Sequence, residues 1–132
     1  MSYETVLAGL HVRFATVSGI KKILDFVPAG APEPPFLYSA LDRFEIVRSG
    51  QVKATRYYIN HTLCFRWQDN ERAEEELLPF VNSIPDAVDA DPHLGGVLTA
   101  GYAEITDGEA RWLTIGSTEY RIIEFHSVVT EK

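Results

Sequence analysis

The stretch VKATRYYINHTLCFRW, residues 52–67, alternates apolar and polar side chains along most of its length. Successive side chains of a β-strand point to opposite faces, so the pattern predicts one long strand with an apolar face. His61 alone interrupts that face, and we expect a core or interface histidine that is hydrogen-bonded to the backbone. The apolar face holds Tyr57, Ile59, Leu63, Phe65 and Trp67. The other face holds Arg56, Tyr58, Asn60, Thr62, Cys64 and Arg66.

The preceding segment predicts the partner of this strand. FLYSALDRFEIVRSG, residues 36–50, is rich in aromatic and apolar residues, and Phe44 and Ile46 are spaced by two. The Ser49-Gly50 pair is typical of a turn. We therefore expect a long hairpin about residues 48–51, whose tip projects from the body of the protein.

Two segments have the period of amphipathic helices. The first runs from about residue 3 to 16, with Ser2 as its cap and Glu4 in its first turn. Its apolar residues are Val6, Leu7, Leu10, Phe14 and Val17. The second, QDNERAEEELLPFVNSI at 68–84, has Asp69 or Asn70 available as cap. Its apolar stripe is Ala73, Leu77, Phe80, Val81 and Ile84.

Prolines and glycines divide the region around the second helix. Pro79 removes one intrahelical hydrogen bond and predicts a kink. Pro85 predicts a restart or the first turn of another short helix. We expect Gly95-Gly96 to stop this helical region.

The rest of the chain predicts more strands. Residues 20–28 fit a strand or a short helix, and the proline-rich loop 28–35 that follows favours a strand. The segment 101–129 predicts two or three strands, with hairpin turns at Asp107-Gly108 and Gly116-Ser117. Helix, strands, helix and strands in this order predict an α+β fold. We expect one domain, residues 1–132, with a mainly antiparallel (mixed) sheet, a long hairpin, and two main helices on one face.

The composition of the chain argues against several classes of protein. The chain has 132 residues, a formal charge of −7 and a single cysteine, Cys64. One cysteine excludes an intramolecular disulfide framework and favours a reducing compartment such as the cytosol. The N-terminus lacks the pattern of a signal peptide, and no apolar run approaches the roughly 20 residues of a membrane span, so we expect a soluble protein with no membrane partner. The acidic balance argues against tight wrapping of nucleic acid.

No catalytic, cofactor or metal site is predicted. Asp89, Asp91 and His93 have the alternating spacing of metal ligands, but Pro92 breaks the run and no bidentate glutamate follows at the calcium-loop offset. We interpret them as a solvated helix end. The four histidines, His11, His61, His93 and His126, lie far apart without a companion motif. His61 and Cys64 point to opposite faces of their strand, which excludes a dyad between them.

Basic residues gather around the predicted hairpin instead. With Tyr58 between them they are compatible with nucleic-acid contact, although arginines on a sheet face more often meet the acidic residues of a protein neighbour. The candidates for an interface are Arg43, Arg48, Gln51, Lys53, Arg56 and Arg66.

Several motifs in order resemble a known family. They are LLPFVNSIP at 77–85, then DADPHLGG, a GYAEI strand and the terminal YRIIEFHSVV. In this order, and in total length, the chain resembles the tail-terminator (tail-completion) proteins of long-tailed bacteriophages, of the lambda-like minor tail protein type. The resemblance spans nearly the whole chain.

This resemblance implies a structural protein of the virion and not an enzyme. Such proteins are made in the host cytoplasm and form a hexameric ring on the head-proximal end of the finished tail tube. The ring stops tube polymerisation and gives the head connector, or neck, a docking surface, and no cofactor is implied. Net acidity adds the hypothesis that DNA passes through the ring without specific binding.

Two alternatives remain open at this point. One is a head-side neck or adaptor protein (a head-completion protein) of the same assembly, which would bind the portal-side ring. The other is a small-molecule-binding or enzymatic α+β domain, for which we expect a polar pocket around His61, Tyr57 or His126 and a monomer in solution.

Overall fold

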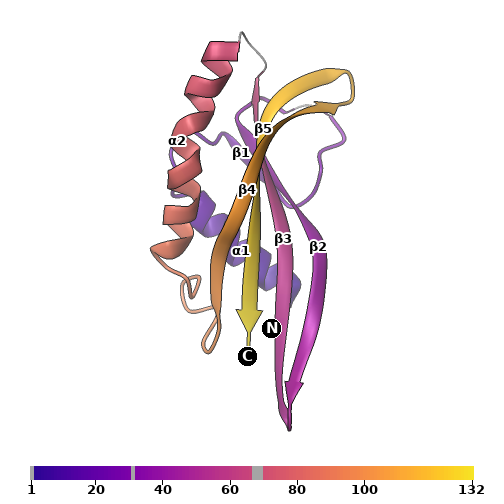
Figure 1. Cartoon of the computed structure of the whole chain (residues 1–132), viewed down its shortest axis with the longest axis vertical. Helices are drawn as coiled ribbons and strands as arrows, with labels where there is room; N and C mark the ends of the chain where they lie inside the picture. Colours follow the sequence, from indigo (N-terminus) through magenta and orange to yellow (C-terminus); the bar gives the residue numbers. More distant parts are fainter. Residues whose placement is uncertain (1, 31, 67–69) are drawn as a thin grey trace.

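Two long hairpins form most of the sheet in the computed structural model, which describes residues 2–30, 32–66 and 70–132 (Figure 1). Strands β2 (Phe36–Ser49) and β3 (Val52–Arg66) make the first hairpin, and β4 (Tyr102–Ile115) and β5 (Thr118–Glu131) make the second. The short strand β1 (Lys22–Leu24) completes a five-stranded sheet in the order β1-β2-β3-β5-β4. β1 pairs parallel with β2, and every other pairing is antiparallel.

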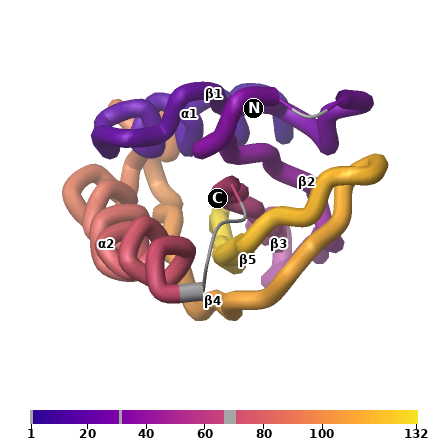
Figure 2. The backbone as a smooth tube through the Cα atoms, turned by 90° about the horizontal axis from the view of Figure 1, so that it is seen from above, coloured from indigo at the N-terminus to yellow at the C-terminus, as the bar shows by residue number. Residues whose placement is uncertain are grey.

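Both helices, α1 (Tyr3–Phe14) and α2 (Asn70–Asp89), lie on one face of this sheet (Figures 1 and 2). The α+β class, the mainly antiparallel sheet and the two helices on one face are thereby confirmed. The predicted strand within 20–28 and the turn after Ser49 are confirmed as well.

The main core fills the space between the helices and the sheet. Its largest fully buried side chains include Phe14 from α1, Phe65 from β3 and Ile84 from α2. Burial of this kind stabilises a fold by about 25 cal/mol per Å² of apolar surface removed from water. Ser2 caps α1 as predicted, because its hydroxyl accepts a hydrogen bond from the Thr5 backbone N–H at 3.3 Å.

A second, smaller cluster lies on the opposite face of the sheet. It is built from Phe36, Tyr38, Cys64, Tyr120 and Ile122. Partly buried residues near the β4–β5 turn and in β1 pack against it, and this end of the second hairpin curls over (Figure 1). Cys64 therefore points away from His61, as the alternation predicts.

Two β-bulges lie at the same level of the sheet. One interrupts β2 between Leu41 and Arg43, and the other interrupts β4 between Ile105 and Asp107. The paired residues Ile59 and Ser127 of the two central strands lie beside them. Bulges increase local twist, so the outer strands bend at one height.

Four local predictions are wrong. Asp107-Gly108 is not a hairpin turn: β4 pairs with β5 along its whole length, and a Cβ on Gly108 would lie 2.9 Å from the Glu124 carbonyl oxygen. The glycine therefore permits close backbone approach instead of a reversal. α2 does not restart at Pro85, because it continues through that residue to Asp89.

The third correction concerns Val81, which is predicted as a member of the apolar stripe of α2 but is 47% exposed. The other four predicted residues of the stripe are buried. The fourth correction concerns the end of α2, which lies at Asp89 and not at Gly95-Gly96. The two glycines lie in the following turns with positive φ. The predictions for Trp67 and for Asp69 as a cap fall outside the described residues.

Candidate functional site

The outer half of the β2–β3 hairpin projects beyond the rest of the sheet (Figure 1). β1 pairs only with Phe36–Tyr38, so within the described residues the edge of β2 from Ser39 onward has no strand neighbour. On the other side, β5 pairs with β3 only as far as Thr55. We call residues 41–58 the projecting hairpin. Its end is held by the pairing of its own two strands.

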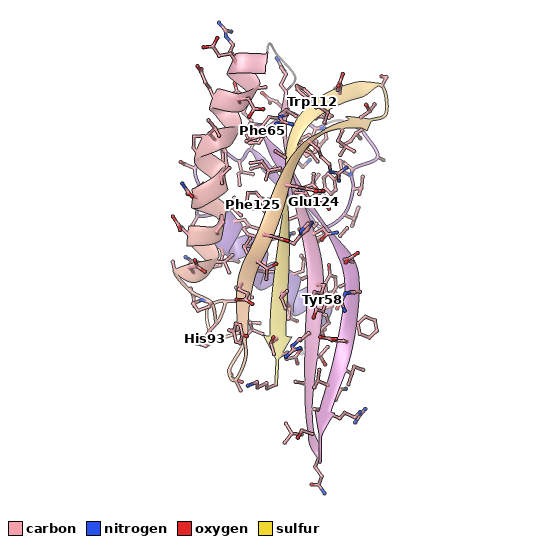
Figure 3. The ribbon with its side chains drawn as sticks, viewed as in Figure 1. Tyr58, Phe65, His93, Trp112, Glu124 and Phe125 are labelled. Atoms are coloured by element: carbon pink, nitrogen blue, oxygen red, sulfur yellow. The ribbon has the colours of Figure 1, made fainter. Side chains whose placement is uncertain are left out.

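A polar cluster stiffens the projecting hairpin on the face away from the helices. The Glu45 carboxylate accepts hydrogen bonds from the Tyr58 hydroxyl at 2.7 Å and from Arg56 at 3.2 Å. The ring of Tyr58, which is labelled in Figure 3, also contacts a cation. The Arg43 guanidinium lies 3.7 Å from the ring centroid. Hydrogen bonds from Tyr58 and then Arg56 lower the pKa of Glu45. Arg43 and Arg56 therefore already have partners within the chain.

The helix-facing side of the projecting hairpin is apolar and uncovered. Leu41, Phe44 and Ile46 are 41%, 58% and 46% exposed. The first turn of α1 reaches β3, where the Tyr3 and Tyr57 rings lie 5.8 Å apart, but leaves these β2 side chains in solvent. Clustered apolar exposure on one strand is typical of a protein-binding surface.

The tip of the hairpin carries the remaining basic candidates. Arg48 pairs in register with Lys53, and Gln51 lies in the turn next to Gly50, whose φ is 62°. All three side chains are exposed. Within the described part of the chain, Arg48 and Lys53 form no ion pair. The tip therefore offers two cations to a partner.

Arg66 does not belong to this surface. It lies at the opposite end of β3, ten residues from Arg56, which corresponds to roughly 33 Å of strand. There it lines shallow depressions with Glu33 and Pro34. Five of the six interface candidates therefore lie on the projecting hairpin. The sequence pattern did not indicate that the sixth, Arg66, lies elsewhere.

A buried chain of hydrogen bonds passes through His61. Its Nδ1 lies 2.7 Å from the Ser39 hydroxyl, and its Nε2 lies 2.8 Å from the Ser127 hydroxyl. Ser127 donates to the Ile59 carbonyl, which leaves His61 Nε2–H as the donor to Ser127. His11 extends this series of hydrogen bonds, because its Nε2 lies 2.9 Å from the Ser39 hydroxyl.

These buried hydrogen bonds have a structural role. His11 Nδ1 lies 3.2 Å from Asp25, so Asp25, His11 and Ser39 follow the order of a hydrolase relay. However, the side chains of Ser39 and His61 are fully buried, so no substrate can reach them. Burial lowers the pKa of His61 to about 3, which keeps the ring neutral. The core histidine is as predicted, but its ring partners are two serine hydroxyls and not the backbone.

Polar groups also gather near His126. A depression of about 440 Å³ on the face away from the helices is lined by Arg43, Tyr58, Asn60 and Asp107, among others. His126 Nδ1 lies 2.6 Å from the Asp107 carboxylate. The Arg43 and Tyr58 side chains that reach this depression are those of the stiffening cluster.

The acids after α2 shape a loop. The Asp91 carboxylate accepts a hydrogen bond from the Gly95 backbone N–H at 2.7 Å. His93 Nδ1 lies 2.8 Å from the Gly101 carbonyl oxygen, to which it donates (Figure 3). Among the described residues, no group of histidine, cysteine and acidic side chains has a metal-binding arrangement.

Cys64 is a buried free thiol, and desolvation raises its pKa to about 12. Burial keeps this thiol protonated at neutral pH, which makes it a poor nucleophile. In the described part of the chain, no helix has the length and apolarity to cross a membrane.

No family model matches this chain, and a search of curated proteins gives no match.

Proposed function

We propose that this protein is a virion assembly protein that caps the end of a phage tail tube as a ring, stops tube polymerisation and provides a docking surface for the head. The projecting hairpin is the observation that carries the proposal. It combines an unpaired strand edge, exposed apolar side chains and a cationic tip. The order of sequence motifs from LLPFVNSIP to YRIIEFHSVV points in the same direction.

The free edges of the sheet support assembly. Soluble proteins normally protect edge strands with charges, bulges or covering loops, because an open edge pairs with other chains. Here β2 has one bulge but then continues for seven residues to Ser49, with Phe44, Ile46 and Val47 exposed along it. Such an edge is a surface on which a strand of a neighbouring chain can pair.

A ring requires two different surfaces on each subunit, which meet those of the next subunit in a head-to-tail manner. The sheet order places β2 near one border and β4 at the other, so one chain carries two unlike borders. Repetition of one contact around an axis then closes a ring. Six copies carry a formal charge of 6 × (−7) = −42, which favours passage of DNA without adhesion.

The function can be tested with polymerising tail-tube protein from the same phage genome. Purified protein is added during polymerisation, and tube length and end structure are measured by electron microscopy. We expect shorter tubes with extra density at one end. Phe44→Asp should abolish this effect, whereas the matched control Val12→Asp, at an exposed valine of α1, should retain it.

The outcomes also separate the alternative functions. Binding to the portal-side ring without any effect on tube length would favour a head-side adaptor. Binding along the wall of the tube instead of at its end would refute the proposal. A protein that stays monomeric with tubes present and binds a small molecule at the His126 depression would favour a ligand-binding domain.

A further inference from the structure

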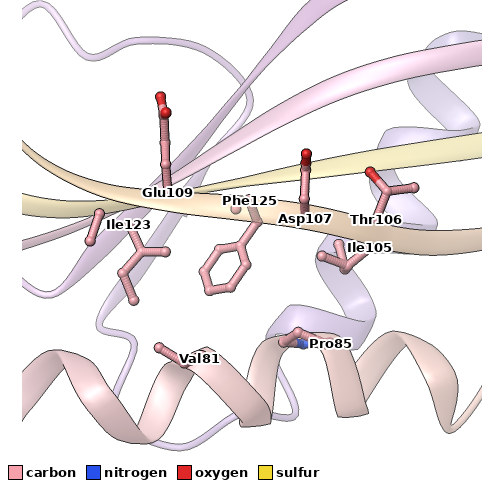
Figure 4. Close-up of a pocket in the computed structure, with 10 residues that line it drawn as sticks. Val81, Pro85, Ile105, Thr106, Asp107, Glu109, Ile123 and Phe125 are labelled. Carbon is pink, nitrogen blue, oxygen red and sulfur yellow. The ribbon is translucent and has the colours of Figure 1, made fainter.

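An apolar groove separates α2 from the outer strand β4 (Figure 4). Val81 and Pro85 form its helical wall, and Ile123 and Phe125 of β5 form its floor. Both floor side chains are directed towards the helix, while Asp107 and Glu109 point away from it on β4 (Figure 4). The groove has a volume of about 270 Å³.

Small residues on β4 create this groove. Gly108 lies opposite Phe125, and Ala110 lies opposite Ile123, both on the helix-facing side. A larger residue at either position would fill the space between strand and helix. Because Gly108 and Ala110 are both small, they leave Val81 on the facing helix 47% exposed. Leu78, one turn earlier on α2, is also 58% exposed.

The groove and the projecting hairpin both expose apolar side chains to solvent. The hairpin presents Leu41, Phe44 and Ile46 on its helix-facing side, and the groove is open on the helix-facing side of the opposite sheet border. Three strand spacings, about 14 Å, separate β2 from β4 within one chain. The two surfaces therefore cannot meet inside one molecule, but they can meet between two.

Charge supports the same pairing. The projecting hairpin has four basic and two acidic side chains, a formal charge of +2. The rest of the chain has 8 basic and 17 acidic side chains, a formal charge of −9. Asp107 and Glu109 of β4 lie on the face away from the groove, are 69% and 59% exposed in their side chains, and already lie beside His126 and Arg111 (Figure 4). A cationic tip approaching this border gains attraction that a second hairpin would not provide.

Strand direction is compatible as well. β2 is antiparallel to β3, β3 to β5, and β5 to β4, so β2 is antiparallel to β4. A neighbour placed beside the sheet with the same face towards its helices presents its free β2 edge antiparallel to β4. Backbone pairing across the border is then geometrically available only on the part of β4 that follows Ala103, because the Ala103 N–H already donates to the Pro92 carbonyl at 2.8 Å. The apolar side chains of β2 fall on the side where the groove opens.

We propose that the groove between α2 and β4 receives the projecting hairpin of a neighbouring copy of the same chain, with Phe44 and Ile46 packed against Val81. This inference rests on the proposed ring, because it names the two surfaces that meet in it. It is a head-to-tail contact, so each copy uses both surfaces and the assembly grows in one direction until it closes.

Cysteine cross-linking tests the contact directly. Phe44→Cys and Val81→Cys are made in separate chains, mixed, and treated with a short bismaleimide, both alone at high concentration and with tail tubes present. Buried Cys64 serves as an internal blank, because the wild-type chain should not react. We expect a cross-linked dimer from the mixture and none from either variant alone. A chain with both substitutions should give a ladder that ends at the closed ring.

A matched control uses Val12→Cys, at a valine of α1 that is 64% exposed and lies outside both surfaces. Mixed with Phe44→Cys, it should not cross-link. Dimers from Phe44→Cys alone would indicate a symmetric contact and overturn the inference, and so would the absence of cross-links in the mixture under both conditions.

The result is independent of the capping assay. Cross-linking between positions 44 and 81 in a protein that does not limit tube length would leave this contact standing and refute the proposed function. Capping without that cross-link would support the proposed function and refute this contact.

Discussion

Acid should destabilise this protein through His61, and replacement of His61 by glutamine should remove much of that sensitivity. Burial lowers the pKa of His61 from 6.5 to about 3, and charges on His11 and His126 act in the same direction. An unfolded chain exposes the imidazole and restores its ordinary pKa. Between these two values the unfolded state therefore binds a proton that the folded state does not accept.

The sign and size follow from proton linkage. The unfolded state binds more protons in this window, so stability is fully present above pH 6.5 and falls as the pH falls towards 3. One whole proton corresponds to about 1.4 kcal/mol per pH unit, and integration from pH 7 to pH 5 gives a loss of about 2 kcal/mol. The pKa of His11 is also lowered, mainly by burial, and its contribution is present in both proteins.

The assay is urea unfolding at pH 7, 6 and 5 for the wild type and for His61→Gln. Glutamine can still hydrogen-bond to the hydroxyls of Ser39 and Ser127 but does not titrate. The variant is less stable at pH 7, and we expect the difference in unfolding free energy to shrink by about 2 kcal/mol at pH 5. Val12→Asn, at an exposed and non-titrating valine of α1, should keep the wild-type pH dependence.

Equal pH slopes for the wild type and His61→Gln would refute the reasoning. A second measurement does not depend on the variant: in the folded wild type, the NMR signals of the His61 ring should show no titration down to pH 4. A midpoint near 6.5 would contradict a buried neutral imidazole.

Three further predictions concern the core. Cys64 should resist thiol reagents in the folded protein at pH 8 and react fully in urea, as followed by mass spectrometry. Gly101→Ala should lower the unfolding free energy by several kcal/mol, because the new Cβ would overlap the backbone oxygen of Thr130. In thermal melts, Gly30→Ala should be neutral or slightly stabilising, because its Cβ would meet nothing within 4 Å. Phe80→Ala should cost about 3–5 kcal/mol in urea unfolding, while exposed Leu78→Ala should change stability by less than about 0.5 kcal/mol; equal effects would contradict the assignment of the two faces of α2.

The strands of the first hairpin show how far periodicity reaches. Alternation along 52–66 predicted which side chains of β3 face the helices, because the two faces of a strand differ by one residue and one of them is buried. The same reasoning did not find the partners of His61. Ser39 and Ser127 are polar residues at positions that face the core. They lie 22 and 66 residues from His61 in the sequence, so no local pattern predicts the contact.

Turn chemistry was less informative than periodicity. Asp107-Gly108 has the composition of a tight turn, but a glycine is also required where backbones approach closely, and a short motif does not distinguish these cases. Pro85 likewise did not end α2, because the helix continues with Val88 fully buried in the core. In both places the structure is determined by strand pairing and core packing between residues that lie far apart in the sequence.

The candidate site was predicted in part. The basic cluster of the hairpin could be identified from sequence, since five of its residues lie within one predicted hairpin. Arg66 was grouped with them although a straight strand carries it to the other end of the sheet. The groove had no sequence signal, because Gly108 and Ala110 belong to β4 while Val81 belongs to α2.

The amino-acid sequence by itself determined the α+β class, the long hairpin, the two helices and their buried stripes, because these depend on patterns with a period of 2 or 3.6 residues. Only the tertiary structure decided the order β1-β2-β3-β5-β4, which leaves the apolar edge of β2 and the groove beside β4 at opposite sides of one sheet. The physical reason is that strand order and groove shape arise from contacts between segments far apart in the chain. No local pattern encodes such contacts, and in this protein they place the two surfaces where only a second molecule can join them.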